Sequence, residues 1–300
     1  MKKLILYLHL TRWKNLLLLV FSLLLFKYRV FPFFKTTSLL TNLEFFLLLM
    51  SVVCIAMGGY IINDIYDIEC DRINKPKKAF IPLYIDLLTA KFLYRFSTAL
   101  GFLCGLSLCI SIHETIYILS YIVIIAILYF YTLHLKTVAL LGNITTSLLI
   151  SFNLILFVLL DSNIQELNQG IYLTLLFSVF AFFLNFIREV IKDIEDIKGD
   201  YNAGLKTLPI LIGTERTVKF ILIFSLIPTY LLINFGTQEL TDDTPIQLFY
   251  WTFIIAPFFL YIYKTYTARS KHDFRFISQI LKFILTFGLI LIYLITIEHA

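Results

Sequence analysis

Residues 43–71 read LEFFLLLMSVVCIAMGGYIINDIYDIECD, an apolar run that becomes acidic towards its end. The first part, 43–62, is long enough to cross a bilayer as a helix, which takes about 20 mainly apolar residues. Asp64, Asp67 and Asp71 follow it directly. At about 100° per residue, their spacing places the three carboxylates within roughly 60° of one another on a helix. The stretch therefore predicts a membrane-spanning helix with an acidic stripe at its polar end.

The same spacing occurs a second time in the chain. Residues 188–209 read REVIKDIEDIKGDYNAGLKTLP, in which Asp193, Asp196 and Asp200 follow the apolar run 170–188. A charge run at the end of a helix is often no more than a solvated face. Two stripes of identical spacing among only 20 acidic residues favour a shared functional site instead.

The composition of the whole chain is that of a polytopic membrane protein. Of its 300 residues, 59% are hydrophobic and 15% charged, against about 25% charged in a soluble domain. Nine apolar runs are long enough to span: 15–34, 43–62, 87–111, 115–133, 138–160, 170–188, 218–236, 246–263 and 276–297. No Gly/Ser-rich linker divides them, so we expect one all-α domain over residues 1–300. Its two long polar connections are 63–86 and 189–217.

The basic residues predict the orientation. With the N-terminus in the cytoplasm, all but three of the 25 Lys and Arg residues fall on the cytoplasmic side. The exceptions, Lys27, Arg29 and Lys35, fall in the first outer loop. This asymmetry indicates a multi-pass protein of the cell (inner) membrane, with its C-terminus outside and both acidic stripes facing the cytoplasm. Because the basic residues flank the spans in this way, the net charge of +5 does not predict nucleic-acid binding.

Carboxylates on membrane helices are costly unless they are paired or bind a metal, and six of them together repel one another. Mg²⁺ is the expected partner, because it prefers hard oxygen ligands and is usually completed by substrate phosphates. When an allylic isoprenoid diphosphate bound there loses its diphosphate, a carbocation remains, and an apolar pocket would shield it from water. We predict as metal ligands Asp64, Asp67, Asp71, Asp193, Asp196 and Asp200, and all of these except Asp193 as catalytic residues.

These motifs resemble those of the UbiA superfamily of intramembrane prenyltransferases. The family's NDxxDxxxD motif matches Asn63 to Asp71 without a gap, and its DxxxD motif matches Asp196 and Asp200. The number of spans agrees as well, so the resemblance covers nearly the whole chain. It implies a Mg²⁺-dependent enzyme that moves a prenyl group from an isoprenoid diphosphate to a lipophilic acceptor within the bilayer.

Further residues would contact the substrates. Arg12 and Asn15 resemble the family's R-x-x-N element, although an anchor at the membrane surface would look the same. Lys206 resembles a lysine that faces the diphosphate in the segment G-x-K-[ST], after a turn at Gly204. Lys136 and Asn143 resemble a further segment, where Asn143 would equally serve as a helix cap. The predicted substrate-binding residues are Arg12, Asn15, Asn63, Arg72, Asn143 and Lys206.

For Arg72 two roles remain open, a bidentate contact to diphosphate oxygens and an ion pair with Asp71. Many relatives carry a basic-proline pair and a Ser-Gly turn after the first motif. Here residues 75–82 read KPKKAFIP, so that Lys77 or Lys78 would replace the usual arginine. The four cysteines form no metal-ligand pattern, and we expect all of them to be reduced and none to be catalytic.

The acceptor is less well determined than the donor. The two acidic stretches look most like the branch that makes digeranylgeranylglyceryl phosphate, in which a hydroxyl of a prenylglyceryl phosphate is alkylated. Lys91, Arg95 or Arg188 would then serve the acceptor phosphate. An aromatic quinone precursor is the alternative acceptor, and a divalent-cation transporter is the alternative of another class. Transporter sites usually lie near the bilayer midplane, whereas these clusters lie at helix ends. The sequence carries no signal for oligomeric state.

Overall fold

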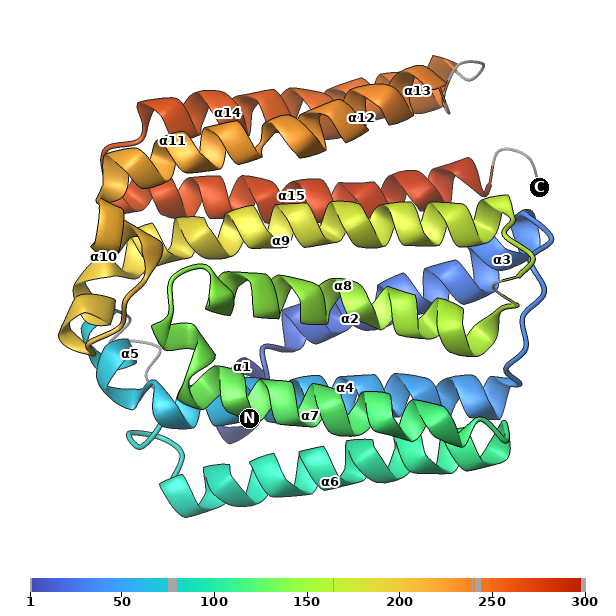
Figure 1. Ribbon diagram of the computed structural model, residues 1–300, viewed down its shortest axis with the longest axis horizontal. Helices are drawn as coiled ribbons and strands as arrows, with labels where there is room; N and C mark the ends of the chain where they lie inside the picture. The colour runs from blue at the N-terminus through green and yellow to red at the C-terminus, as the bar shows by residue number, and fades with distance from the viewer. Residues whose placement is uncertain (1, 75–79, 164, 239, 241–243, 298–300) are drawn as a thin grey trace.

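The computed structural model describes residues 2–74, 80–163, 165–238, 240 and 244–297. Long helices lie side by side in a single bundle, and the described residues form no β-strand (Figure 1). The elements are α1 (Lys2–Leu10), α2 (Trp13–Leu25), η1 (Phe26–Val30), α3 (Phe31–Phe33), α4 (Asn42–Tyr66), α5 (Ile68–Asn74), α6 (Leu87–Ser111), η3 (Thr115–Tyr117), α7 (Ile118–Leu133), η4 (Leu135–Thr137), α8 (Leu141–Asp161), α9 (Gln169–Asn202), α10 (Leu208–Ile212), α11 (Thr214–Phe224), α12 (Leu226–Gln238), α13 (Thr244–Tyr250), η5 (Trp251–Ile255), α14 (Ala256–Thr267) and α15 (Lys271–Ile295).

The all-α class and the nine predicted spans are confirmed. Within the described residues, nine helical segments are long and apolar enough to cross a membrane. They are Trp13–Phe33, Asn42–Tyr66, Leu87–Ser111, Thr115–Leu133, Leu141–Asp161, Gln169–Asn202, Thr214–Gln238, Pro245–Thr267 and Lys271–Ile295.

The two polar connections are shorter than the sequence predicts. Helix α9 continues through 34 residues to Asn202, so the first half of the predicted connection 189–217 is helical. Helix α4 continues to Tyr66, and α5 follows it after Asp67 alone. Polar side chains end an apolar pattern but do not end a helix, because the backbone hydrogen bonds continue beyond the hydrocarbon layer. Both acidic stripes are therefore carried largely on helices.

Irregular turns precede three prolines within the spans. Proline has no N–H to donate to the carbonyl four residues earlier. For Pro32 and Pro257 that carbonyl lies in a π-helical turn, η1 or η5 respectively. For Pro228 it belongs to Phe224, where α11 ends before α12 begins. Each irregularity is thus explained by a missing backbone donor.

One end of the bundle holds both acidic stripes. Helices α5 and α10 and the α7–α8 connection lie at the left end of Figure 1, and α3 lies at the opposite end. Helix α4, which leads to the first stripe, packs closely on α6. A Cβ atom at Gly101 of α6 would lie 2.9 Å from the backbone nitrogen of Ile55 on α4. Small residues of this kind let membrane helices approach closely.

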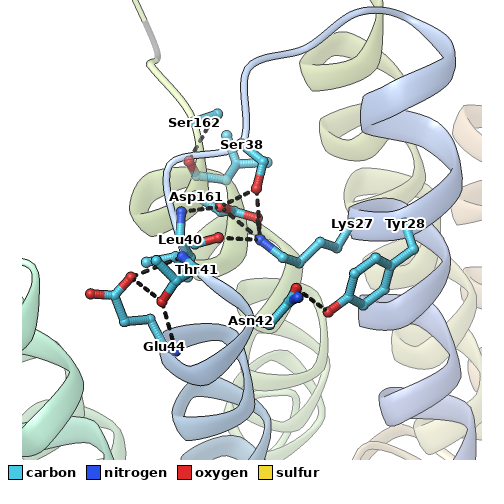
Figure 2. A network of polar contacts seen from close by, with 10 residues as sticks. Lys27, Tyr28, Ser38, Leu40, Thr41, Asn42, Glu44, Asp161 and Ser162 are labelled. Atoms are coloured by element: carbon cyan, nitrogen blue, oxygen red, sulfur yellow. Dashed lines mark hydrogen bonds and ion pairs between the residues drawn. The ribbon is translucent and has the colours of Figure 1, made fainter.

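A buried ion pair joins three segments at the other end of the bundle (Figure 2). The Lys27 ammonium donates to Asp161 Oδ2 at 2.9 Å, to Ser38 Oγ at 2.6 Å and to the Leu40 carbonyl at 2.8 Å. The side chains of Lys27 and Asp161 are only 4% and 0% exposed. The count of basic residues assigns Lys27 and Arg29 to the first outer loop, and this is wrong. Both lie in the helical turn η1, inside the span predicted from the apolar run 15–34.

Candidate active site

The first acidic stripe crosses the junction between α4 and α5. Asp67 separates the two helices, yet helical hydrogen bonds continue across it. Its amide donates to the Asn63 carbonyl at 2.9 Å, and the Asp71 amide donates to the Asp67 carbonyl at 2.8 Å. The 0, +3, +7 spacing therefore lies on a nearly continuous helical path.

Cationic and amide groups bind the carboxylates of this stripe. Arg12 donates to Asp64 Oδ1 at 3.0 Å, and its guanidinium lies over the Tyr60 ring, 4.9 Å from the centroid. Arg12 itself joins α1 to α2 with a φ of 50°, a conformation that a residue other than glycine adopts at some cost. Asp67 accepts bonds from Lys136 and, at 2.7 Å, from Asn63 Nδ2.

The second stripe lies entirely on α9. Asn143, near the start of α8, donates to Asp193 Oδ2 at 2.8 Å. Lys271, at the start of α15, lies 3.7 Å from Asp196 Oδ1. Asp196 and Asp200 are buried although they lie at the polar end of the bundle. Burial is costly for a carboxylate, and Lys271 near Asp196 and the Cys70 thiol on Asp200 offset part of that cost.

Asn74 fastens α5 to α9 and so joins the two stripes. Its Nδ2 donates to the Asp196 carbonyl at 2.9 Å, and its Oδ1 accepts from the Gly199 amide at 3.0 Å. A Cβ atom at Gly199 would lie within 2.6 Å of three atoms of this carboxamide. The Cys70 thiol donates to Asp200 Oδ1 at 3.2 Å. Burial, assisted by the Asp200 charge, raises the pKa of Cys70, so the thiol stays protonated as a donor.

The α7–α8 connection and the first turn of α8 contact both stripes as well. Lys136 binds Asp67 of the first stripe, and Asn143 binds Asp193 of the second. The carbonyl of Thr137 accepts the Lys206 amide at 3.1 Å, which holds the segment after α9 against the same connection. Sequence-distant segments are thereby assembled around one set of carboxylates.

A cavity of about 270 Å³ extends into the bundle from Asn63 and Lys192, the chain neighbours of Asp64 and Asp193, although none of the six aspartates is among its lining residues. Its lining runs along α4 from Asn63 to Val52 and along α9 from Lys192 to Phe177. At 1.5 Å per residue these stretches correspond to about 16 and 22 Å. The deep part is lined mainly by Leu and Ile side chains. A long apolar tail with a polar head group matches this shape.

The polar end of the cavity is predominantly cationic. Arg12, Arg188, Lys192 and Lys282 line it, with Glu189 as the carboxylate among them. Lys282 donates to Asn15 Oδ1 at 2.7 Å. The Nε of Arg188 is enclosed and has no hydrogen-bond partner among the described residues. An anionic group of a ligand would find several donors here.

The donor chemistry of the two stripes fits Mg²⁺. All side chains concerned are carboxylates, and hard oxygen ligands are what this ion prefers. Among the described residues, no three His, Cys, Asp or Glu side chains lie close enough together to hold a metal ion by themselves. Mg²⁺ sites are commonly completed by substrate phosphates and water, so open carboxylate sets of this kind suit an ion that arrives with a diphosphate.

The predicted substrate residues differ in their position. Arg12, Asn15 and Asn63 line the cavity, and Asn143 contacts Asp193. The side chains of Arg72 and Lys206 are exposed. Gly204 has a φ of 71°, which confirms the predicted turn. Lys77 and Lys78 lie outside the described residues.

Of the residues considered for the acceptor phosphate, Arg188 lines the cavity, whereas Lys91 and Arg95 are exposed on α6. Sequence reasoning gave no role to Asn74, Lys271 or Lys282, each of which contacts a site residue. Of these three, only Asn74 could have been identified from the sequence, because it lies three residues after Asp71 and thus on the same side of the helix as the acidic stripe.

Substitutions that break the hydrogen bonds between Asn74 and α9 should lower activity without unfolding the protein. Replacing Gly199 with alanine would displace the Asn74 carboxamide, and Asn74→Ala would remove its bonds to α9. We expect each variant to lower kcat by at least 10-fold, because misplaced catalytic groups are costly even at a distance of about 1 Å. Lys198→Ala, at the exposed neighbouring position, is the control. Equal kcat values for Gly199→Ala and Lys198→Ala would contradict the role of this contact.

The comparisons with known proteins agree with this geometry. Residues 15–287 match the model of the UbiA prenyltransferase family. The digeranylgeranylglyceryl phosphate synthase of Methanosphaera stadtmanae is 31% identical over 238 residues, covering 77% of this chain and 80% of the relative. The synthase of Sulfurisphaera tokodaii is 29% identical over 248 residues, covering 79% of each chain.

Solved structures share the fold. One structure, described as that of a digeranylgeranylglyceryl phosphate synthase in membranes, has a TM-score of 0.68 at 22% identity and covers 99% of this chain and 100% of its own. A UbiA homologue from Archaeoglobus fulgidus bound to GPP and Mg²⁺ has a TM-score of 0.58 at 19% identity, with 96% and 99% covered. From its matched length, its motifs and its fold, this chain belongs to the UbiA prenyltransferase family.

Proposed function

We propose that this protein transfers a prenyl group from an isoprenoid diphosphate to a lipophilic acceptor in the membrane. The observation that carries the proposal is the position of two carboxylate stripes, joined through Asn74, Lys136 and Asn143, next to residues that line the polar end of a deep apolar cavity. The carboxylates suit a metal-bound diphosphate and the cavity suits its tail.

The proposed metal ligands are Asp64, Asp67, Asp71, Asp193, Asp196 and Asp200. Bound Mg²⁺ would neutralise the charge that develops on the diphosphate as its bond to carbon breaks. Arg12 and Lys136, which contact Asp64 and Asp67, would bind the outer diphosphate oxygens. Asn63 would hold Asp67 in place through its 2.7 Å bond. Arg72 and Lys206 would close over the diphosphate from their exposed positions.

The apolar lining would hold the tail and exclude water from the allylic cation. Tyr60 and Tyr131 line the polar end of the cavity, where their ring faces would stabilise a nearby cation. Cationic donors at the same end suit an acceptor that carries a phosphate. Together with the similarity to digeranylgeranylglyceryl phosphate synthases, this favours geranylgeranyl transfer to a hydroxyl of a prenylglyceryl phosphate.

The proposed orientation places the carboxylate end in the cytoplasm. Lys and Arg concentrate in the segments at this end, which follows the usual inside-positive distribution. The protein would then be a single domain of the cell membrane, with its N-terminus inside and its C-terminus outside. In this arrangement a water-soluble diphosphate product would leave towards the cytoplasm.

The branch is tested with purified protein in lipid, radiolabelled geranylgeranyl diphosphate and a panel of acceptors. We expect an ether product with geranylgeranylglyceryl phosphate. Transfer only to an aromatic acid would support prenyl transfer from the diphosphate but reject the prenylglyceryl phosphate as the acceptor. Mg²⁺ flux into proteoliposomes without any prenyl transfer would reject the enzyme and favour a transporter.

A further inference from the structure

Glu189 is a carboxylate of the cavity wall that belongs to neither acidic stripe. It lies on α9 four residues before Asp193, which corresponds to about 6 Å deeper in the bundle. Asn185 lines the wall one further turn down, where the apolar part begins. Glu189 is therefore level with the boundary between head group and tail. In a bound prenyl diphosphate, the carbon that reacts lies at this boundary.

The two oxygens of Glu189 have different surroundings. Arg188 Nη1, at 3.1 Å, and Lys192 Nζ both donate to Oε1. The described residues provide no hydrogen bond to Oε2, and this atom is not among the fully enclosed polar atoms. The side chain retains 21% of its exposure, on the wall of the cavity. One oxygen is thus anchored by two cations while the other is accessible to a ligand.

We infer that Glu189 Oε2 accepts the proton of the acceptor hydroxyl during prenyl transfer. The inference rests on the proposed function and adds a residue to it. Because the reacting carbon and this oxygen would lie at the same depth of one cavity, an acceptor hydroxyl bound between them would reach both. Arg188 and Lys192 would act as positioning residues, since they fix Oε1 and so orient Oε2.

The step balances without any oxidant or further reactant. The bond between the first prenyl carbon and the diphosphate oxygen breaks, and its electron pair leaves with the diphosphate. A lone pair of the acceptor hydroxyl forms the new carbon–oxygen bond. As this bond forms, Oε2 takes the hydroxyl proton, so that a neutral ether is left and the attack is not reversed. The hydroxyl becomes strongly acidic as its oxygen bonds to the cationic carbon, so a carboxylate between two cations is still a sufficient base.

A different role would be charge balance alone. The polar end of the cavity would then need Glu189 only to offset the charges of Arg188 and Lys192. Removing the carboxylate would in that case disturb substrate binding or folding. It would not change how each prenyl cation is partitioned between the acceptor and water. The number of ethers formed per diphosphate released separates the two roles.

The test measures diphosphate release and ether formation in parallel for wild type, Glu189→Gln and Glu189→Asp in lipid. In the glutamine variant we expect ether per diphosphate to fall by roughly 100-fold, the scale of general-base catalysis, while prenyl alcohol accumulates through capture by water. The aspartate variant, which retains a carboxylate, should recover part of the yield. An unchanged ratio in Glu189→Gln would overturn the inference, and so would an equal loss of both products.

If Glu189→Gln does not fold, the double variant with Lys192→Gln replaces it and is compared with Lys192→Gln alone. The double variant loses one negative and one positive charge, so its net charge equals that of wild type and Lys192 no longer leaves an uncompensated cation. A lower ether ratio in the double variant supports the inference, and equal ratios overturn it. Absence of diphosphate release in wild type would instead reject the proposed function, so the two failures are distinguishable.

Discussion

Replacing Asp67 or Asp196 with alanine is expected to lower kcat by about 1000-fold or more. Each substitution removes a carboxylate that would hold the metal-bound diphosphate. Electrostatic stabilisation of this type contributes several kcal/mol, and about 4 kcal/mol corresponds to three orders of magnitude in rate. Asp67→Asn should behave similarly, because the amide keeps the shape of the side chain but not its charge.

The measurement is prenyl transfer by each variant in lipid at saturating donor. Both variants should insert and unfold at temperatures close to that of wild type, since Asp67 is partly exposed and Asp196 lies at the bundle end. Glu69→Ala is the matched control, because Glu69 lies between Asp67 and Asp71 with an exposed side chain. Full activity of Asp67→Ala and Asp196→Ala would show that the carboxylate stripes do not serve the reaction.

The second large effect concerns stability at the opposite end of the bundle. Asp161→Ala would leave the Lys27 ammonium buried without its carboxylate partner (Figure 2). Breaking a buried ion pair in this way costs about 3–5 kcal/mol. Replacing both residues with apolar ones of similar size is much less damaging, because no uncompensated charge remains. We therefore expect Asp161→Ala to be strongly destabilised and the pair Lys27→Met, Asp161→Leu to recover much of the loss.

Thermal or denaturant unfolding in detergent measures this effect. Glu166→Ala serves as the control, since Glu166 is an exposed acid at the same end, five residues further along the chain. The fraction of Asp161→Ala that stays folded should retain its kcat, as Asp161 ends α8 whereas Asn143, which contacts Asp193, lies near the start of the same helix. A wild-type unfolding midpoint for Asp161→Ala would contradict the role assigned to the pair.

Lys27 also marks the limit of what the sequence could predict. The nine spans can be predicted from the sequence, because each one depends only on the hydropathy of about 20 consecutive residues. The partner of Lys27 lies 134 residues away, so neither hydropathy nor the distribution of basic residues identifies it. The predicted span 15–34 contains Lys27, but the distribution of basic residues favours a loop, and only the structure shows that this lysine is buried in a helical turn.

The same distinction applies to the carboxylate end. The spacing of Asp64, Asp67 and Asp71 can be read in the sequence, and the stripe lies on a nearly continuous helical path through α4 and α5. The contact of Asn74 with Gly199 spans 125 residues and depends on how α5 packs on α9. The depth of Glu189 in the cavity likewise depends on α9 continuing beyond its apolar part. Motifs thus indicate which residues matter, and packing determines which of them meet.

The central claim is that the two carboxylate stripes bind a metal-bound isoprenoid diphosphate and promote its ionisation. Release of diphosphate from geranylgeranyl diphosphate, by purified protein in lipid, tests this claim most directly. The account predicts release with Mg²⁺, its loss on chelation with EDTA, its return when Mg²⁺ is restored, and no return in Asp67→Ala. Equal release in the presence of EDTA, or no release from this donor or from shorter isoprenoid diphosphates with Mg²⁺ present, would contradict it.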